Sequence, residues 1–120
     1  MSKAATSVLV FGVYLALLGV TLVAVPNVLL GVFAMPATGE IWIRVVGVLV
    51  LCLAFYYTQA ARRGLNDFLQ WTVYVRCFVF VSFVVFVVLR LVQPTLALFG
   101  VIDLVGATWT LLALRRPRGA

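Results

Sequence analysis

Charged residues stand inside long apolar stretches of the sequence, and the side chains most able to do chemistry are those of Asp103, Arg76 and Arg44. A charge at the centre of a bilayer costs about 2.5–3.5 kcal/mol on insertion scales, so such residues are rare and are usually paired or functional. A carboxylate beside a guanidinium suits either a buried ion pair or an acid–base group with an electrostatic partner. Asp103 and Arg76 are therefore the candidate catalytic residues.

Composition excludes several other kinds of site. The 120 residues include no histidine, and the two cysteines, Cys52 and Cys77, lie in different apolar stretches, so neither a metal site nor a cofactor is predicted. The net charge is +6, but the basic residues stand mostly beside apolar stretches and do not form a patch interleaved with aromatics. Membrane lipids are therefore the expected partners, and nucleic acid is not.

The elements that must position these residues are transmembrane helices. Hydrophobic residues make up 66% of the chain and charged residues 10%, which leaves too little polar surface for a soluble fold of this length. Each of four apolar stretches is long enough to cross a hydrocarbon core of ~30 Å as a helix. The predicted fold is a single all-α domain over residues 1–120, a membrane bundle with spans at residues 6–25, 41–61, 68–92 and 95–114.

The first outer connection contains a further apolar segment, Val28–Ala34, that is too short to span. Pro26 and Pro36 bracket this segment, and proline favours the first turn of a helix and disfavours helix just before itself. The pattern predicts a short helix lying at the outer membrane interface.

Basic residues predict the orientation of the bundle. If the helices alternate in direction, the basic residues beside the spans fall on one side of the membrane. The connections on the other side contain Glu40 and are expected to contain no Lys or Arg. The positive-inside rule then places both termini and the loop at residues 62–66 in the cytoplasm, and the protein in the inner membrane. The basic residues expected on the cytoplasmic side are Lys3, Arg62, Arg63, Arg115, Arg116 and Arg118.

Helical phase gives each span one face with polar or small residues, which should point into the bundle because polar groups avoid lipid. Arg90 shares such a face but lies near its helix end, and is expected to reach outward to the interface. The predicted inward faces are Ser7, Tyr14 and Thr21; Arg44, Gly47, Phe55 and Thr58; Thr72, Arg76, Phe83 and Arg90; and Asp103, Gly106, Ala107 and Thr110.

Depth refines the expected pairing of Asp103. At a rise of about 1.5 Å per residue, Asp103 lies about 12 Å from the outer end of its span, and Arg76 about 12 Å from the cytoplasmic end, level with Tyr14. Asp103 is expected to meet Arg76, Arg44 or both, and a weak internal repeat would give Arg44 and Asp103 equivalent positions. The predicted ligand-binding residues are Arg44, Arg76, Asp103 and Tyr14.

The run Arg44-Val45-Val46-Gly47-Val48-Leu49, with an apolar helix on either side, resembles the second helix of DoxX-like small membrane proteins. The likeness extends in topology over most of the chain. It implies a four-helix architecture and a role beside quinone-associated oxidoreductase complexes or in the assembly of membrane proteins.

Three functions remain open from the sequence. The first is a non-catalytic accessory, scaffold or assembly module, expected to form homo-oligomers or to bind a partner membrane protein, with a buried Arg–Asp network that fixes helix register. The second is an intramembrane enzyme or binding protein for a lipophilic molecule such as a quinone, sterol or lipid, which uses Asp103 and Arg76. The third is a small channel or exporter. A cavity beside Asp103 and Arg76 would favour the second function, and a tightly filled interior would exclude it.

Overall fold

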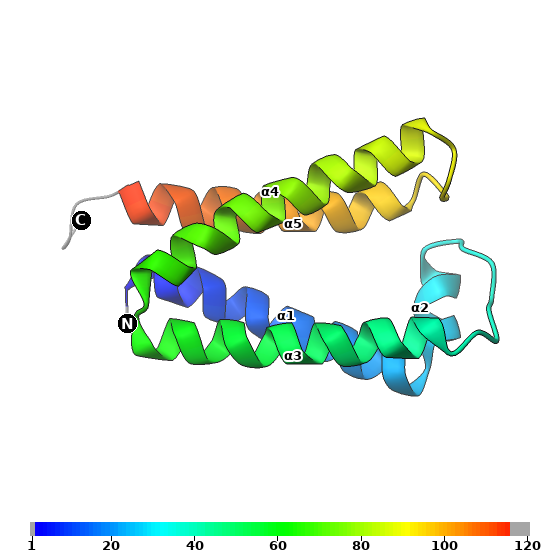
Figure 1. The fold of residues 1–120 in the computed structure, drawn as a ribbon, viewed down its shortest axis with the longest axis horizontal. Helices are drawn as coiled ribbons and strands as arrows, with labels where there is room; N and C mark the ends of the chain where they lie inside the picture. Colours follow the sequence, from blue (N-terminus) through cyan, green and yellow to red (C-terminus); the bar gives the residue numbers. More distant parts are fainter. Residues whose placement is uncertain (1, 116–120) are drawn as a thin grey trace.

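Each of the four long apolar stretches forms one helix in the computed structural model, which describes residues 2–115 (Figure 1). These four helices are long and apolar enough to cross a membrane, and a fifth, short helix follows the first. The all-helical fold predicted from the sequence is confirmed over the described residues. The helices are α1 (Lys3–Ala24), α2 (Pro26–Val32), α3 (Trp42–Arg63), α4 (Asn66–Val88) and α5 (Leu96–Arg115).

The long helices form two antiparallel hairpins that lean against each other. Helix α1 packs along α3 and α4 packs along α5, whereas contacts between the hairpins come chiefly from α1 and α5. Figure 1 shows the hairpins close together where α1 begins and α5 ends, and farther apart where α2 lies. We call these the closed end and the wide end of the molecule.

Two glycines let α1 and α3 approach closely. A Cβ atom added at Gly19 would lie 3.0 Å from the Gly47 carbonyl oxygen, and one added at Gly47 would lie 3.0 Å from the Gly19 carbonyl oxygen. Small residues at helix crossings are typical of membrane bundles, because close backbone packing replaces the hydrophobic drive that lipid removes. Gly47 lies inside the bundle, as its helical phase predicts.

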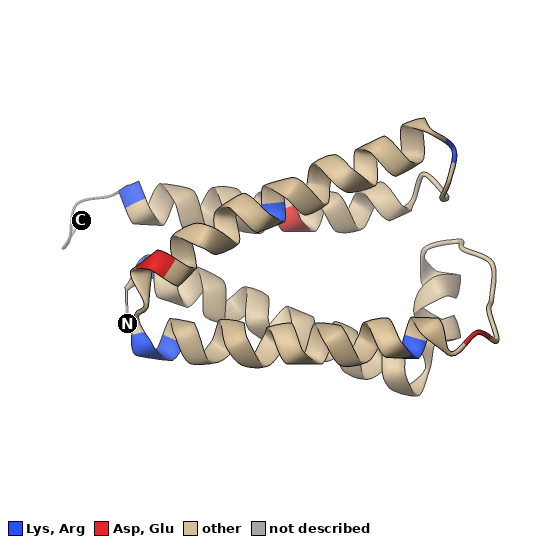
Figure 2. Cartoon of the chain, in the orientation of Figure 1, with Lys and Arg blue, Asp and Glu red and all other residues tan. Residues whose placement is uncertain are grey.

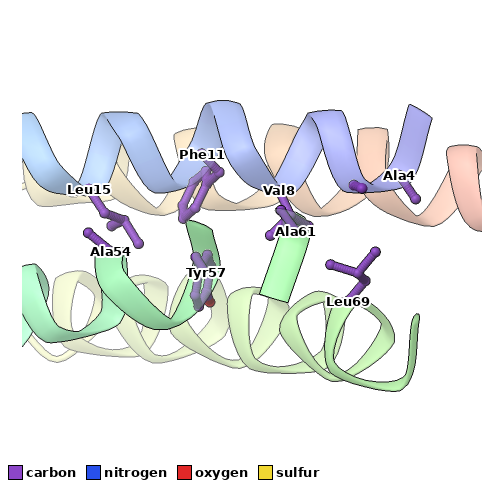
Figure 3. Packing of buried hydrophobic residues seen from close by; sticks show 9 residues of the cluster. Ala4, Val8, Phe11, Leu15, Ala54, Tyr57, Ala61 and Leu69 are labelled. Carbon is purple, nitrogen blue, oxygen red and sulfur yellow. The ribbon is translucent and has the colours of Figure 1, made fainter. Parts of the chain in front are cut away.

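The apolar core is concentrated around the first half of α1 (Figure 3). Outside it, large apolar side chains are commonly exposed: Trp71 is 60% exposed and Phe78 61%. Soluble monomers rarely expose so much contiguous apolar surface. The core residues drawn in Figure 3 come from α1, α3 and α4, and those labelled are Ala4, Val8, Phe11, Leu15, Ala54, Tyr57, Ala61 and Leu69.

Pro26 starts α2, the short helix that the sequence predicts for this connection. Proline suits the first helical turn, because the N–H that it lacks would have no partner within the helix there. The helix ends at Val32, and Ala34 just beyond it adopts a left-handed φ of 55°. Phe33 then stacks on Phe99 of α5 with ring centroids 4.3 Å apart. The first connection therefore reaches across the wide end to the second hairpin.

The end of α4 differs from the prediction. The apolar run continues to Val92, but the helix ends at Val88 and Arg90 adopts a left-handed φ of 59°. The backbone N–H groups of Arg90 and Leu91 donate hydrogen bonds of 3.0 and 2.9 Å back to the last turn, which is the pattern of a Schellman cap. Arg90 therefore lies in the connection between α4 and α5. The predicted absence of Lys and Arg from the connections at this end of the bundle is wrong.

Candidate site at the buried arginine

Arg76, near the middle of α4, is the one buried charged side chain in residues 2–115, with 1% of its surface exposed. Its Nη2 donates to the Thr72 hydroxyl at 3.0 Å and to the Thr110 hydroxyl at 2.8 Å, and its Nε donates to the Thr72 carbonyl at 3.2 Å. The Thr110 and Ser7 hydroxyls share a further hydrogen bond of 2.7 Å. We call Ser7, Thr72 and Thr110 the hydroxyl cluster; together with Arg76 it links α1, α4 and α5.

The guanidinium also contacts an aromatic ring and a glycine. Its Cζ lies 4.8 Å from the centroid of the Phe11 ring, within range of a cation–π interaction. A Cβ atom added at Gly106 would lie 3.1 Å from Nη1, so the bare glycine makes room for this nitrogen. Nη1 is buried and has no hydrogen-bond partner among the described residues. Because an unpaired buried donor costs about 1–3 kcal/mol, Nη1 is the atom of this site that still needs an acceptor.

Asp103 lies on the same helix as Thr110 but nearer the wide end. The hydrogen bonds of the Arg76 side chain go to the hydroxyl cluster and the Thr72 backbone, and within residues 2–115 none joins it to the Asp103 carboxylate. Thr110 follows Asp103 by seven residues, or about 10 Å along the helix axis. Helical phase put both residues on one face of α5, and α4 near Arg76 runs level with α5 near Asp103, since a Cβ added at Gly100 would lie 3.5 Å from the Phe80 Cα atom. The Arg76 side chain extends toward the start of α4, where it bonds Thr72, and in that direction it reaches Thr110 and not Asp103.

Arg44 caps the end of α1 instead of meeting Asp103. Its Nη1 donates to the Val23 carbonyl oxygen and, at 3.4 Å, to the Ala24 carbonyl oxygen. A cation at the carboxyl end of a helix complements the helix dipole and the carbonyls left free there. Arg44 is the third residue of α3 whereas Asp103 is the eighth of α5, so the weak repeat does not bring them to equivalent depths. Arg44 is therefore separate from the site around Arg76.

A cavity of about 330 Å³ lies between the hairpins, beside Arg76 and toward the wide end. Its lining is apolar and comes from all five helices, except for four residues with polar groups: Tyr14, Tyr57, Arg76 and Asp103. Small-molecule pockets typically measure ~300–1,000 Å³ and combine an apolar wall with a few polar groups that orient the ligand. Three of the four residues predicted to bind a ligand, all except Arg44, thus line one cavity.

The cavity opens sideways between α3 and α4. Val46 and Val75 line it from these two helices and are 49% and 55% exposed, whereas Leu15 and Leu22 on the α1 wall are each 8% exposed. Figure 1 shows α3 and α4 diverging toward the wide end, and the two helices make little contact. A molecule that enters the cavity would therefore pass between α3 and α4, across a surface made of apolar side chains.

Tyr57 is a polar cavity residue that is absent from the residues predicted to point inward or to bind a ligand. It is 6% exposed, and its ring centroid lies 5.9 Å from that of Phe11. Phe55, which was predicted to point inward, is 60% exposed, so that prediction is wrong. The predicted inward face of α3 is rotated by roughly a quarter turn about the helix axis from the buried face, because the prediction placed Arg44 on it. The seven-residue spacing of the small residues Gly47, Ala54 and Ala61 marks the true face, on which Tyr57 also lies.

Apart from Arg76 and Asp103, the charged residues gather at the two ends of the molecule (Figure 2). Arg116 and Arg118, which the sequence also assigns to the cytoplasmic side, lie outside the described residues. The closed end carries Lys3, Arg62, Arg63, Asp67 and Arg115, and the wide end carries Glu40, Arg44 and Arg90.

The polar groups of the site limit its chemistry. Cys52 and Cys77 are free thiols on separate helices and neither lines the cavity. Residues 2–115 contain no cluster of three or more Cys, Asp or Glu side chains that could hold a metal ion. What the cavity offers is one guanidinium, one carboxylate and two phenolic hydroxyls, which together can orient a polar head group by hydrogen bonds.

Comparison of the chain with known protein families, with curated proteins and with solved structures found no match. The resemblance to DoxX-like proteins therefore stays a prediction from the sequence.

Proposed function

We propose that this protein is a four-span protein of the inner membrane that binds a lipophilic small molecule in the cavity beside Arg76 and Asp103. The observation that carries the proposal is a mostly apolar cavity whose few polar groups include a buried guanidinium with an unpartnered Nη1. A cavity with an apolar wall and a few polar groups suits a ligand with an apolar body and a polar head. The opening between α3 and α4 suits a ligand that comes from the lipid phase.

A tryptophan substitution inside the cavity tests this proposal. Val79 lines the cavity, so Val79→Trp should fill it, whereas Val81 on the same helix is 58% exposed and lies outside the cavity. The probe is a monoacylglycerol that carries a diazirine in its acyl chain, added to the detergent-solubilised protein and crosslinked by light. We expect Val79→Trp to reduce crosslinking about tenfold, a loss of about 1.4 kcal/mol of binding, with Val81→Trp close to wild type. Equal crosslinking of the two variants would contradict the proposal.

We further propose that the closed end faces the cytoplasm. Four basic residues of the described chain stand there against Arg44 and Arg90 at the wide end, which gives the bias of the positive-inside rule. The test labels Thr38→Cys in a background that carries Cys52→Ala and Cys77→Ala, with a thiol reagent that does not cross membranes. Labelling of intact cells is expected. Labelling that requires cell lysis would reverse the orientation.

The buried Arg76 network favours a second candidate, an accessory or assembly module without a ligand. Its hydrogen bonds join α4 to α5 and, through Thr110 and Ser7, to α1, as a device that fixes helix register would. Such a module would act as a homo-oligomer or on a partner membrane protein. It predicts that Val79→Trp, which leaves those hydrogen bonds in place, preserves the association state seen in chemical crosslinking of whole membranes.

A further inference from the structure

The cavity carries two opposite formal charges that are not joined by a hydrogen bond. Arg76 and Asp103 both line it, but the hydrogen bonds of Arg76 go to Thr72 and Thr110. Each charged group thus retains hydrogen-bonding capacity of its own. Nη1 of Arg76 lacks an acceptor, and among the described residues no donor is hydrogen-bonded to the Asp103 carboxylate.

We infer that the head group of the bound molecule is electrically neutral and carries both a hydrogen-bond acceptor and a hydrogen-bond donor, as in a monoacylglycerol or a fatty amide. The inference rests on the proposed function and specifies its ligand class. A guanidinium only donates and an ionised carboxylate only accepts. A head that satisfies both must therefore bring an acceptor, such as a carbonyl oxygen, to Arg76 and a donor, such as a hydroxyl or amide N–H, to Asp103.

The charges of Arg76 and Asp103 disfavour a ligand whose head group is itself charged. An anionic head would gain from Arg76 but would lie beside the Asp103 carboxylate, and a cationic head would meet the reverse conflict. Like charges brought together in an apolar site are poorly screened and discriminate strongly against the wrong ligand. A neutral head avoids both conflicts and can use the Tyr14 and Tyr57 hydroxyls, which act as donors or acceptors.

The dimensions place the tail of the ligand outside the cavity. About 330 Å³ is at the lower limit of small-molecule pockets, so the cavity suits a head group and the first part of a chain. The exposed lining residues Val46 and Val75 mark the route by which the rest of a long chain would leave, between α3 and α4. Head-group chemistry, and not chain length, should therefore decide selectivity.

A series of lipids with the same tail tests the inference. Monoolein, oleamide, oleate and oleylamine differ only in the head, and each is titrated as a competitor against the diazirine probe at mildly alkaline pH. The two neutral lipids should compete at least about tenfold better than oleate and oleylamine, a difference of about 1.4 kcal/mol. Asp103→Asn removes the negative charge from the cavity, so oleate should then improve at least about tenfold while oleylamine weakens further.

Glu40→Gln is the matched control, because Glu40 is an exposed acid at the wide end and does not line the cavity. It should leave the order of the four lipids unchanged. An order in which oleate matches the neutral lipids on the wild type would overturn the inference, as would an Asp103→Asn variant with the wild-type order. If all four lipids compete equally and Val79→Trp abolishes crosslinking, the inference fails while the proposed cavity function stands. If the probe crosslinks the wild type and Val79→Trp equally, the proposed function itself fails.

Discussion

The Arg76 guanidinium of α4 and the Thr110 hydroxyl of α5 lie 2.8 Å apart and are both buried, with 1% and 0% of their surfaces exposed. Thr110 is also hydrogen-bonded to Ser7 at 2.7 Å. One hydroxyl therefore bonds two side chains from other helices, in addition to the Gly106 carbonyl of its own helix, at the level where the two hairpins still touch. Thr110 thus connects the two hairpins through side-chain hydrogen bonds, whereas no such bond of Asp103 is present within residues 2–115.

Replacing Thr110 by valine should destabilise the protein. The substitution keeps the shape of the side chain but leaves Arg76 Nη2 and Ser7 Oγ without this partner, at an expected loss of about 1–3 kcal/mol in the free energy of unfolding. Thermal or denaturant unfolding in detergent measures the effect. Thr108→Val is the control, because the exposed Thr108 hydroxyl bonds only to the Leu104 carbonyl of its own helix, at 2.8 Å. If the two variants lose equal stability, the hydroxyl cluster does not hold the hairpins together.

Adding a methyl group at Gly19 should separate α1 from α3. A Cβ there would lie 2.7 Å from Leu51 Cγ and 3.0 Å from the Gly47 carbonyl oxygen, and the backbone atom cannot give way as a side chain can. Overpacking of this kind typically costs about 1–3 kcal/mol, to be measured as a lower unfolding midpoint of Gly19→Ala. Gly31→Ala is the comparison, because a Cβ at Gly31 in α2 meets nothing within 4 Å. That variant should be neutral or slightly more stable, by up to about 1 kcal/mol.

Arg90→Gly should stabilise the end of α4. The left-handed φ of 59° strains any residue with a Cβ by about 1–2 kcal/mol, and glycine adopts it without strain. Part of the gain is offset by the greater freedom of glycine in the unfolded chain, so we expect an increase of about 1 kcal/mol or less. Arg90→Ala loses the same charge and keeps the strain. An unfolding midpoint that rises equally in both variants would assign the effect to charge.

Arg44→Ala should loosen the end of α1. The variant loses the donors to the Val23 and Ala24 carbonyls and a cation at the negative end of the helix dipole, together about 0.5–2 kcal/mol. Hydrogen exchange of the last turn of α1 measures the local effect. Arg62→Ala, at the opposite end of α3, should leave exchange in that turn unchanged. Wild-type protection in Arg44→Ala would contradict the capping role.

The sequence predicts the helices well because apolar length and proline position are local properties. The four long helices and the short helix after Pro26 are confirmed, and Ser7, Thr72, Arg76 and Thr110 are buried on the faces that helical phase predicts. Phase fixes the direction of a side chain about its own helix axis.

Partners depend on which way a long side chain extends along its helix, which phase does not determine. The Arg76 side chain extends toward the start of α4 and meets Thr110, not Asp103, and Arg44 finds carbonyls that become available only where α1 ends. The left-handed turn at Arg90 is equally hidden, because no glycine or proline stands at the end of the Val and Leu run to mark it. The cavity follows from the angle between the hairpins and likewise has no local signal.

The divergence of the two hairpins toward α2 gives the molecule the outline of a wedge (Figure 1). Inserted in the proposed orientation, a wedge that is broader at its outer end displaces more lipid from the outer leaflet than from the inner one. The surrounding bilayer then relaxes by bending outward around the protein. Such a protein would favour membrane that is already convex toward the side on which its wide end lies.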